Sequence, residues 1–156
     1  MRRPVTVSGI GVVSVFGASH AEFRDALLAG RTGIAPLTGF ETAGCRSTLA
    51  AEMIGFEPSA WVPPMKSRRM DRTGVYAIAA TKLALDDAGL SIPSDGDDHL
   101  GVLLGTWTAG GGSTQQFLDA LFRRGPSGAP ALLSTAPSRM PPRAWPDWST
   151  AFAGPT

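Results

Sequence analysis

The sequence changes character at Leu133, and this change limits what the chain can fold into. Before Leu133, apolar runs alternate with segments whose apolar residues repeat at helical spacing. From Ser134 to Thr156 the chain reads STAPSRMPPRAWPDWSTAFAGPT, holds five of the 13 prolines, and fits neither a strand nor a helix pattern. We therefore expect a folded region over residues 1–133 and an irregular, proline-rich tail over residues 134–156.

The composition is that of an ordinary globular protein and excludes several classes. The chain has 156 residues, of which 43% are hydrophobic and 17% charged, with a net charge of +1. This balance gives no reason to expect nucleic acid or membrane as a partner, and the longest apolar runs are too short to span a bilayer. The single cysteine, Cys45, cannot form an internal disulfide. With no clear signal sequence, we expect a cytoplasmic location.

The pattern before Leu133 predicts strands that alternate with helices. Val5 to Ser14 is a β-branched run with two glycines, which is typical of a buried strand that ends in a close turn. Ser19 and Glu22 form a capping box for a helix that Gly30 stops. Further elements are expected as a loop or short hairpin over residues 33–48, a strand over 49–54, a helix from Lys66 to Gly89, a strand over 99–105 and a helix from Gly112 to Gly125. Such alternation predicts an α/β fold with a mainly parallel sheet and flanking helices.

Two glycine-rich turns resemble phosphate-binding loops, but both depart from the known patterns. In the turn that begins with Gly9 and Gly11, Ser14 replaces the third glycine of the dinucleotide fingerprint. The turn from Gly105 to Gly110 has the glycine spacing of a P-loop but lacks its lysine. Close backbone packing explains the glycines better, and a small-molecule or phosphate-binding module remains an alternative function.

The side chains needed for catalysis by a thiol or an imidazole are scarce. Cys45, His20 and His99 are the only ones in the sequence. Cys45 is predicted in a loop, and both histidines are predicted at the surface. Metal binding requires clustered ligands, which the sequence lacks, so we expect neither a metal nor a cofactor.

Four segments, in this order and spacing, resemble a β-ketoacyl synthase: RRPVTVSGIGVVSVFG, FRDALLAGRTGI, RRMDRTGVYAIAATKLALDDAGL and GVLLGTWTAGG. The resemblance covers residues 2–133 and corresponds to roughly the opening third of the family. It implies an incomplete, N-terminal part of a thiolase-like fold, which has αβαβα layers. It also implies an acyltransferase that performs decarboxylative Claisen condensation of an acyl thioester with malonyl-carrier protein, in fatty-acid or polyketide synthesis.

The resemblance places no catalytic residue in this chain. The family's nucleophilic cysteine follows a G-L-R-G-P-N segment, and its two histidines come much later. Cys45 lies elsewhere, before the second predicted strand, so the chain is expected to be inactive alone. The resemblance does assign two other sets of residues: Trp107 and Thr108 near the acyl-chain pocket, and a basic surface for carrier-protein docking formed by Lys66, Arg68, Arg69, Arg123 and Arg124. A solvated basic face and a core tryptophan are the alternatives.

The partners implied by the resemblance are acyl carrier protein and a second synthase subunit. The intact family forms homodimers or ketosynthase heterodimers. An alternative function is therefore a non-catalytic partner subunit, comparable to a chain-length factor.

The tail has a second interpretation, a shift of reading frame between Leu133 and Pro137. When the residues from Pro137 onward are back-translated with permitted codons, the shifted frame can encode VADAAASLAGLEYGLRGPN. This segment ends in the family's G-L-R-G-P-N, and the single-codon methionine and tryptophans of the tail all fit it. We therefore expect that a frame slip replaced the family's continuation. A natural proline-rich disordered tail is the alternative.

Overall fold

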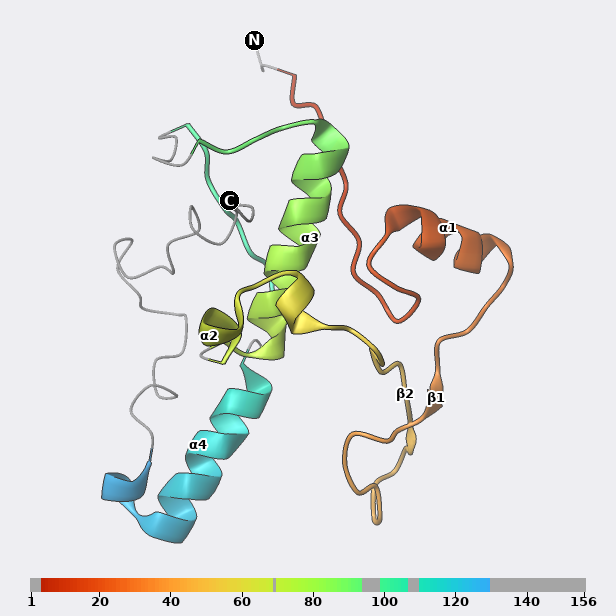
Figure 1. Ribbon diagram of the computed structural model, residues 1–156. Helices are drawn as coiled ribbons and strands as arrows, with labels where there is room; N and C mark the ends of the chain where they lie inside the picture. Colours follow the sequence, from red (N-terminus) through yellow and green to blue (C-terminus); the bar gives the residue numbers. More distant parts are fainter. Residues whose placement is uncertain (1–3, 69, 94–98, 107–109, 130–156) are drawn as a thin grey trace. The chain divides into compact units, whose positions relative to one another are not determined.

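The computed structural model describes residues 4–68, 70–93, 99–106 and 110–129 (Figure 1). The chain divides into two compact units. The first unit comprises Met1–Trp61 and Tyr76–Ser91, and the second comprises Val62–Val75 and Ile92–Thr156. Each unit is described by itself.

Helix α1, His20–Leu28, forms where predicted, with Ser19 as its N-cap. The Ser19 side chain accepts a hydrogen bond of 3.4 Å from the Glu22 backbone N–H. This bond satisfies one of the N–H groups that have no partner inside the helix. After the helix, Gly30 adopts a left-handed φ of 64°, as expected for a glycine that ends a helix.

The segment expected to be a loop or short hairpin, residues 33–48, contributes one two-residue strand, and its partner comes from the strand expected over residues 49–54. Strand β1, Ala35–Pro36, pairs antiparallel with β2, Leu49–Ala50. The Glu52 carboxylate accepts hydrogen bonds from the Thr38 backbone N–H (2.7 Å), the Thr38 hydroxyl (2.9 Å) and the Gly39 backbone N–H (2.8 Å). The strand expected over residues 49–54 therefore stops after two residues. The backbone N–H groups of Thr38 and Gly39 bond to the Glu52 side chain and not to the backbone of a longer strand.

Helix α3, Arg72–Ala88, is the longest helix of the described chain. It begins later than predicted because Asp71 caps it: the Asp71 Oδ1 atom accepts a 2.8 Å hydrogen bond from the Gly74 N–H. Lys66, where the helix was expected to start, lies instead in the separate short helix α2, Pro64–Ser67, which follows the 3-10 helix η1, Pro58–Ala60. The end is as predicted, with Gly89 at φ 63°.

Helix α4, Gly111–Arg124, also forms at the predicted place. Gly110 and Gly125 flank it with φ values of 77° and 76°, and the 3-10 helix η2, Pro126–Gly128, follows. Within the described residues, no helix combines the length and the apolar character that crossing a membrane requires.

The predicted, mainly parallel sheet is not present in the described residues. Residues 4–13 and 99–106 contain no strand, and the strand pair that the described chain does contain is the antiparallel pair β1–β2. A strand requires a neighbour that shares its backbone hydrogen bonds, and the described chain supplies none to these two segments. Their apolar side chains consequently remain in solvent: Val5 is 96% exposed and Leu103 is 101% exposed.

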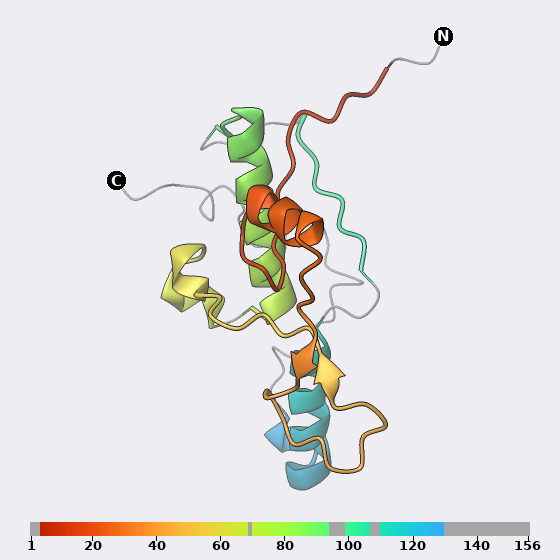
Figure 2. The same cartoon turned by 90° about the vertical axis from the view of Figure 1, so that its right-hand side faces the viewer.

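One side of residues 4–13 is nevertheless packed closely against α3, as Figures 1 and 2 both show. A Cβ atom placed on Gly11 would meet the Ala80 carbonyl oxygen and lie 2.7 Å from the Ala84 nitrogen. A Cβ atom on Gly9 would meet the Ala84 carbonyl oxygen. The Ile10 N–H donates a 2.9 Å hydrogen bond to the Asp87 carboxylate. The glycines of this turn therefore serve close packing, as the sequence predicted.

We predict that Gly11→Ala destabilises the first unit, because its methyl group has no space against the α3 backbone. The expected loss is about 1–3 kcal/mol in the free energy of unfolding, the usual range for an overpacked site. Urea unfolding monitored by far-ultraviolet circular dichroism measures it. Gly101→Ala is the matched control, since nothing lies within 4 Å of its added methyl group; equal stability of the two variants would contradict the packing.

Candidate functional site

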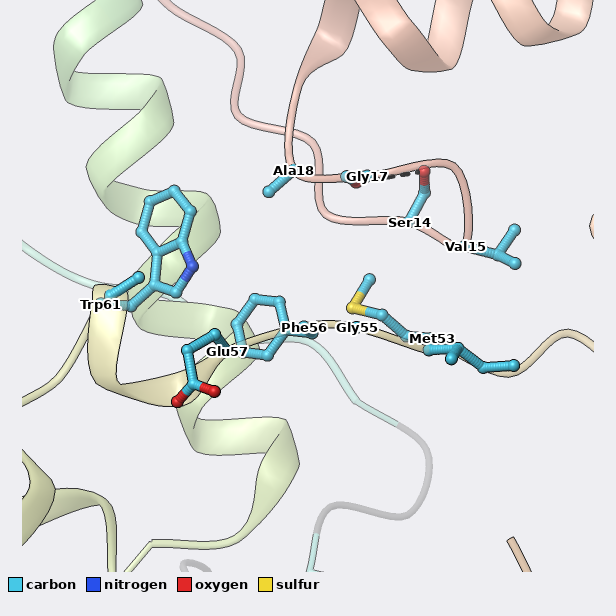
Figure 3. Close-up of a pocket in the computed structure, with 11 residues that line it drawn as sticks. Ser14, Val15, Gly17, Ala18, Met53, Gly55, Phe56, Glu57 and Trp61 are labelled. Carbon is cyan, nitrogen blue, oxygen red and sulfur yellow. Dashed lines mark hydrogen bonds between the residues drawn. The ribbon is translucent and has the colours of Figure 1, made fainter. Parts of the chain in front are cut away.

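The first unit contains a cavity of about 220 Å³ between two segments, residues 14–18 and residues 53–61 (Figure 3). Most of its lining is apolar. The residues that line it are Ser14, Val15, Gly17, Ala18, Met53, Ile54, Gly55, Phe56, Glu57, Ala60 and Trp61.

One wall is a tight turn between Ser14 and Gly17. Their backbones exchange two hydrogen bonds, of 2.8 Å from the Ser14 N–H and 3.0 Å from the Gly17 N–H. The Ser14 hydroxyl also accepts a 3.2 Å hydrogen bond from the Phe16 N–H. Gly17 has a φ of 130°, a value that residues with a side chain rarely adopt. The turn is therefore fixed by local bonds and by glycine at its end.

The opposite wall is attached to α3. The Phe56 ring meets Tyr76 edge to face, with ring centroids 4.8 Å apart, and lies parallel to Trp61 at 6.3 Å. The Lys82 ammonium donates a 2.9 Å hydrogen bond to the Trp61 carbonyl oxygen. These contacts hold the aromatic side of the cavity in place without a ligand.

Glu57 is the only carboxylate among the lining residues, and it is already engaged. Its side chain accepts hydrogen bonds from the Ser59 hydroxyl (2.7 Å) and the Ser59 backbone N–H (3.2 Å). These two bonds, the hydroxyl first, lower the pKa of the Glu57 carboxyl below its ordinary value of 4.5. In Figure 3 the carboxylate points away from the Ser14–Gly17 turn. Among the described residues, the lining includes no thiol or imidazole.

Four of the five basic residues predicted from the sequence lie on or next to two helices of the second unit. Lys66 is on α2 and Arg68 directly follows it, while Arg123 and Arg124 form the last turn of α4. All four are exposed. The Arg123 guanidinium pairs with Asp119 at 3.4 Å, in a contact where both side chains are largely in solvent. The remaining predicted residues, Arg69, Trp107 and Thr108, lie outside the described residues.

The thiol and imidazoles are dispersed, as predicted. Cys45 is an exposed free cysteine in the loop between β1 and β2. His20 opens α1 and His99 precedes the second apolar run, both at the surface. The part of the chain that the structure describes contains no group of three or more His, Cys, Asp or Glu side chains able to hold a metal ion.

Sequence reasoning missed the cavity. Its aromatic wall comes from Phe56 and Trp61, which are five residues apart in a segment without helix or strand periodicity. The contact between Phe56 and Tyr76 joins residues that are remote in sequence, and no local pattern predicts it.

Comparisons with known proteins identify close relatives of this chain. The sequence profile described as "Beta-ketoacyl synthase, N-terminal domain" matches residues 2–143. The 3-oxoacyl-[acyl-carrier-protein] synthase 2 of Coxiella burnetii is 31% identical over 125 residues, which are 80% of this chain and 30% of that protein. The tetracenomycin polyketide synthase ketoacyl synthase beta subunit of Streptomyces glaucescens is 32% identical over 133 residues, 85% of this chain and 32% of that protein.

A solved structure agrees with these relatives. "The ishigamide ketosynthase/chain length factor" superposes with a TM-score of 0.67 at 33% sequence identity, covering 81% of this chain and 32% of that one. The chain thus spans about a third of the length of the proteins it matches.

We predict that Ser59→Ala raises the pKa of Glu57 toward 4.5, because it removes the hydroxyl bond that lowers it most. A carboxyl whose pKa is depressed in the folded protein stabilises the fold above its unfolded pKa, and this contribution is lost as pH falls through the folded pKa. Carbon-13 NMR titration of the Glu57 carboxyl measures the change. Ser47→Ala, which removes a hydroxyl bonded to the Leu49 backbone and not to a carboxylate, should leave the Glu57 titration unchanged.

Proposed function

Because the chain belongs to the β-ketoacyl synthase family, we propose that it is the N-terminal region of a condensing enzyme whose substrates are acyl groups on acyl carrier protein. The observation that carries this proposal is the family match over residues 2–143. The name of the Coxiella relative, a 3-oxoacyl-[acyl-carrier-protein] synthase, supports the choice of substrate.

The reaction proposed for the complete enzyme is decarboxylative Claisen condensation. A cysteine thiolate takes the acyl group, a malonyl thioester loses carbon dioxide, and the resulting enolate attacks the acyl carbon. This chain is proposed to supply fold and docking surface and no catalytic residue. The surroundings of Cys45 support this view, because it lies in an exposed loop and not at a helix N-terminus, where a thiolate would be favoured.

The thiolase-like layers belong to the same proposal. Residues 4–13 and 99–106 keep apolar side chains in solvent, which supports further strands of a complete synthase as their cover. Assembly with a second subunit, a cytoplasmic location and an acyl-chain pocket near Trp107 and Thr108 are likewise proposed from the family.

We predict that the purified chain forms no β-ketoacyl-carrier product from acyl- and malonyl-carrier protein, because the family resemblance places neither the nucleophile nor the two histidines in this sequence. Mass spectrometry of the carrier protein measures the product. A complete synthase assayed in parallel is the positive control. Product above the no-enzyme blank, retained in Cys45→Ala, would show that the catalytic residues lie elsewhere in this sequence.

Carrier docking is proposed for the exposed basic residues on α2 and α4. Acyl carrier protein is acidic in the family, and complementary charge mainly raises the rate of encounter and fixes the register of the complex. The exposed pair between Arg123 and Asp119 contributes little by itself, so Arg123 and Arg124 remain available to an acidic partner.

We predict that the double variant Arg123→Glu/Arg124→Glu slows association with acyl carrier protein by about tenfold at low salt. Surface plasmon resonance at several salt concentrations measures the rate, and the difference should shrink as salt screens the charges. Arg24→Glu/Arg46→Glu makes the same change in net charge elsewhere and is the control. An equal effect of both double variants would favour a solvated basic face without a docking role.

A non-catalytic partner subunit is the second candidate function. The superposition on a ketosynthase/chain length factor and the similarity to a ketoacyl synthase beta subunit favour it. Stable co-purification with a full-length ketosynthase would support this function, whereas the first proposal does not require such a complex.

The tail over residues 134–156 is proposed to arise from a slip of reading frame near Leu133. The matched range ends at residue 143, inside this tail, and so does not fix the boundary. We predict that the coding DNA contains the G-L-R-G-P-N segment in the shifted frame. Codons that do not encode it in that frame would leave a natural proline-rich tail as the explanation.

A further inference from the structure

We propose that the cavity between residues 14–18 and 53–61 binds a small, uncharged molecule with one ring and one hydrogen-bond acceptor. This site is independent of the condensation chemistry proposed above. The inference depends on three features of the cavity: its size, the character of its walls and one donor for which the described residues provide no acceptor.

The size of the cavity sets the first limit on its ligand. At about 220 Å³ it is smaller than the usual pockets for drug-sized molecules, which start at roughly 300 Å³. A single substituted ring is therefore the largest rigid group that we expect it to admit. A long acyl chain or a nucleotide would not be enclosed.

The walls set the polarity of the ligand. Met53, Phe56 and Trp61 line the space, together with Val15 and Ile54. The Glu57 carboxylate accepts two hydrogen bonds from Ser59 and points away from the Ser14–Gly17 turn. The pocket is open on one side, so a charged ligand would lose part of its hydration there, and these side chains would give it no partner in exchange. An uncharged ligand is therefore favoured.

The indole N–H of Trp61 supplies the one directional contact. Figure 3 shows the indole nitrogen facing the space between Trp61, Phe56 and the Ser14–Gly17 turn. The described residues provide no hydrogen-bond acceptor for this N–H, although the backbone carbonyl of the same residue is bonded to Lys82. An indole nitrogen only donates. A carbonyl or ether oxygen on the ligand would satisfy it.

The site is preformed, which lowers the cost of binding. The Ser14–Gly17 turn is closed by two backbone hydrogen bonds, and the aromatic wall is held by Tyr76 and Lys82. Because the walls are already ordered, little conformational entropy is lost when a ligand enters. For a ligand of this size we expect a Kd on the order of 1 mM.

The test uses two probes of nearly equal shape, acetophenone and isopropylbenzene, with the full chain. Nitrogen-15 NMR follows the Trp61 indole N–H, which is assigned by its disappearance in Trp61→Phe. Acetophenone should move this resonance downfield in a saturable manner. Isopropylbenzene, which has a methyl group in place of the oxygen, should bind without the downfield shift.

Variants separate the contribution of the Trp61 indole N–H to probe binding from the contribution of the open space in the cavity. Trp61→Phe keeps an aromatic wall and should weaken acetophenone binding about fivefold, the effect of one neutral hydrogen bond, with little change for isopropylbenzene. Ala18→Leu should abolish binding of both probes by filling the cavity. Ala21→Leu, on the exposed side of α1 and outside the cavity, is the matched control and should bind like the parent chain.

Circular dichroism establishes that each variant keeps the parent helix content, so that loss of binding is not loss of fold. The proposal is overturned if the Trp61 resonance does not respond to saturating acetophenone. It is also overturned if Ala18→Leu binds as well as Ala21→Leu.

Discussion

The close approach of the Gly9 and Gly11 backbone to helix α3 is the contact on which the first unit depends. The absence of side chains at these positions lets the extended segment lie against the carbonyl groups of Ala80 and Ala84, a geometry that suits weak Cα–H···O contacts. This approach positions the Ser14–Gly17 turn that follows. The same helix holds the opposite cavity wall through Tyr76 and Lys82. One helix thus positions both sides of the cavity.

The helices could be predicted from the sequence because the signals that start and stop them are local. Ser19, Gly89 and Gly125 each act within a few residues of the helix end that they define. The strands could not be predicted in the same way. The β-branched run from Val5 indicates an extended backbone, but pairing requires a neighbour that is remote in sequence, and the described residues contain none. The cavity was missed for the same reason, since Tyr76 and Lys82 complete a wall that begins at Met53.

Membership of the β-ketoacyl synthase family offers a reason for the exposure of two apolar segments of this chain. The chain spans about a third of the length of its relatives, and its apolar segments around Val5 and Leu103 are open to solvent. Covering such side chains contributes about 25 cal/mol for each Å² removed from water, so the remaining part of a synthase would gain stability by packing here. The basic side chains at the ends of α2 and α4 are exposed. We propose that the N-terminal region provides a scaffold and a docking surface.

The close approach of Gly9 and Gly11 to α3 is measured most directly by nuclear Overhauser effects between these two glycines and the helix. Cross-peaks are expected from the Gly9 α-protons to the Ala88 methyl group and from the Gly11 α-protons to the Ala84 amide, because atoms at those α positions lie within van der Waals contact of the helix. Sequential cross-peaks within α3 provide the internal reference. Strong α3 cross-peaks without any from Gly9 or Gly11 would show that the helix forms without the segment and would contradict its central role.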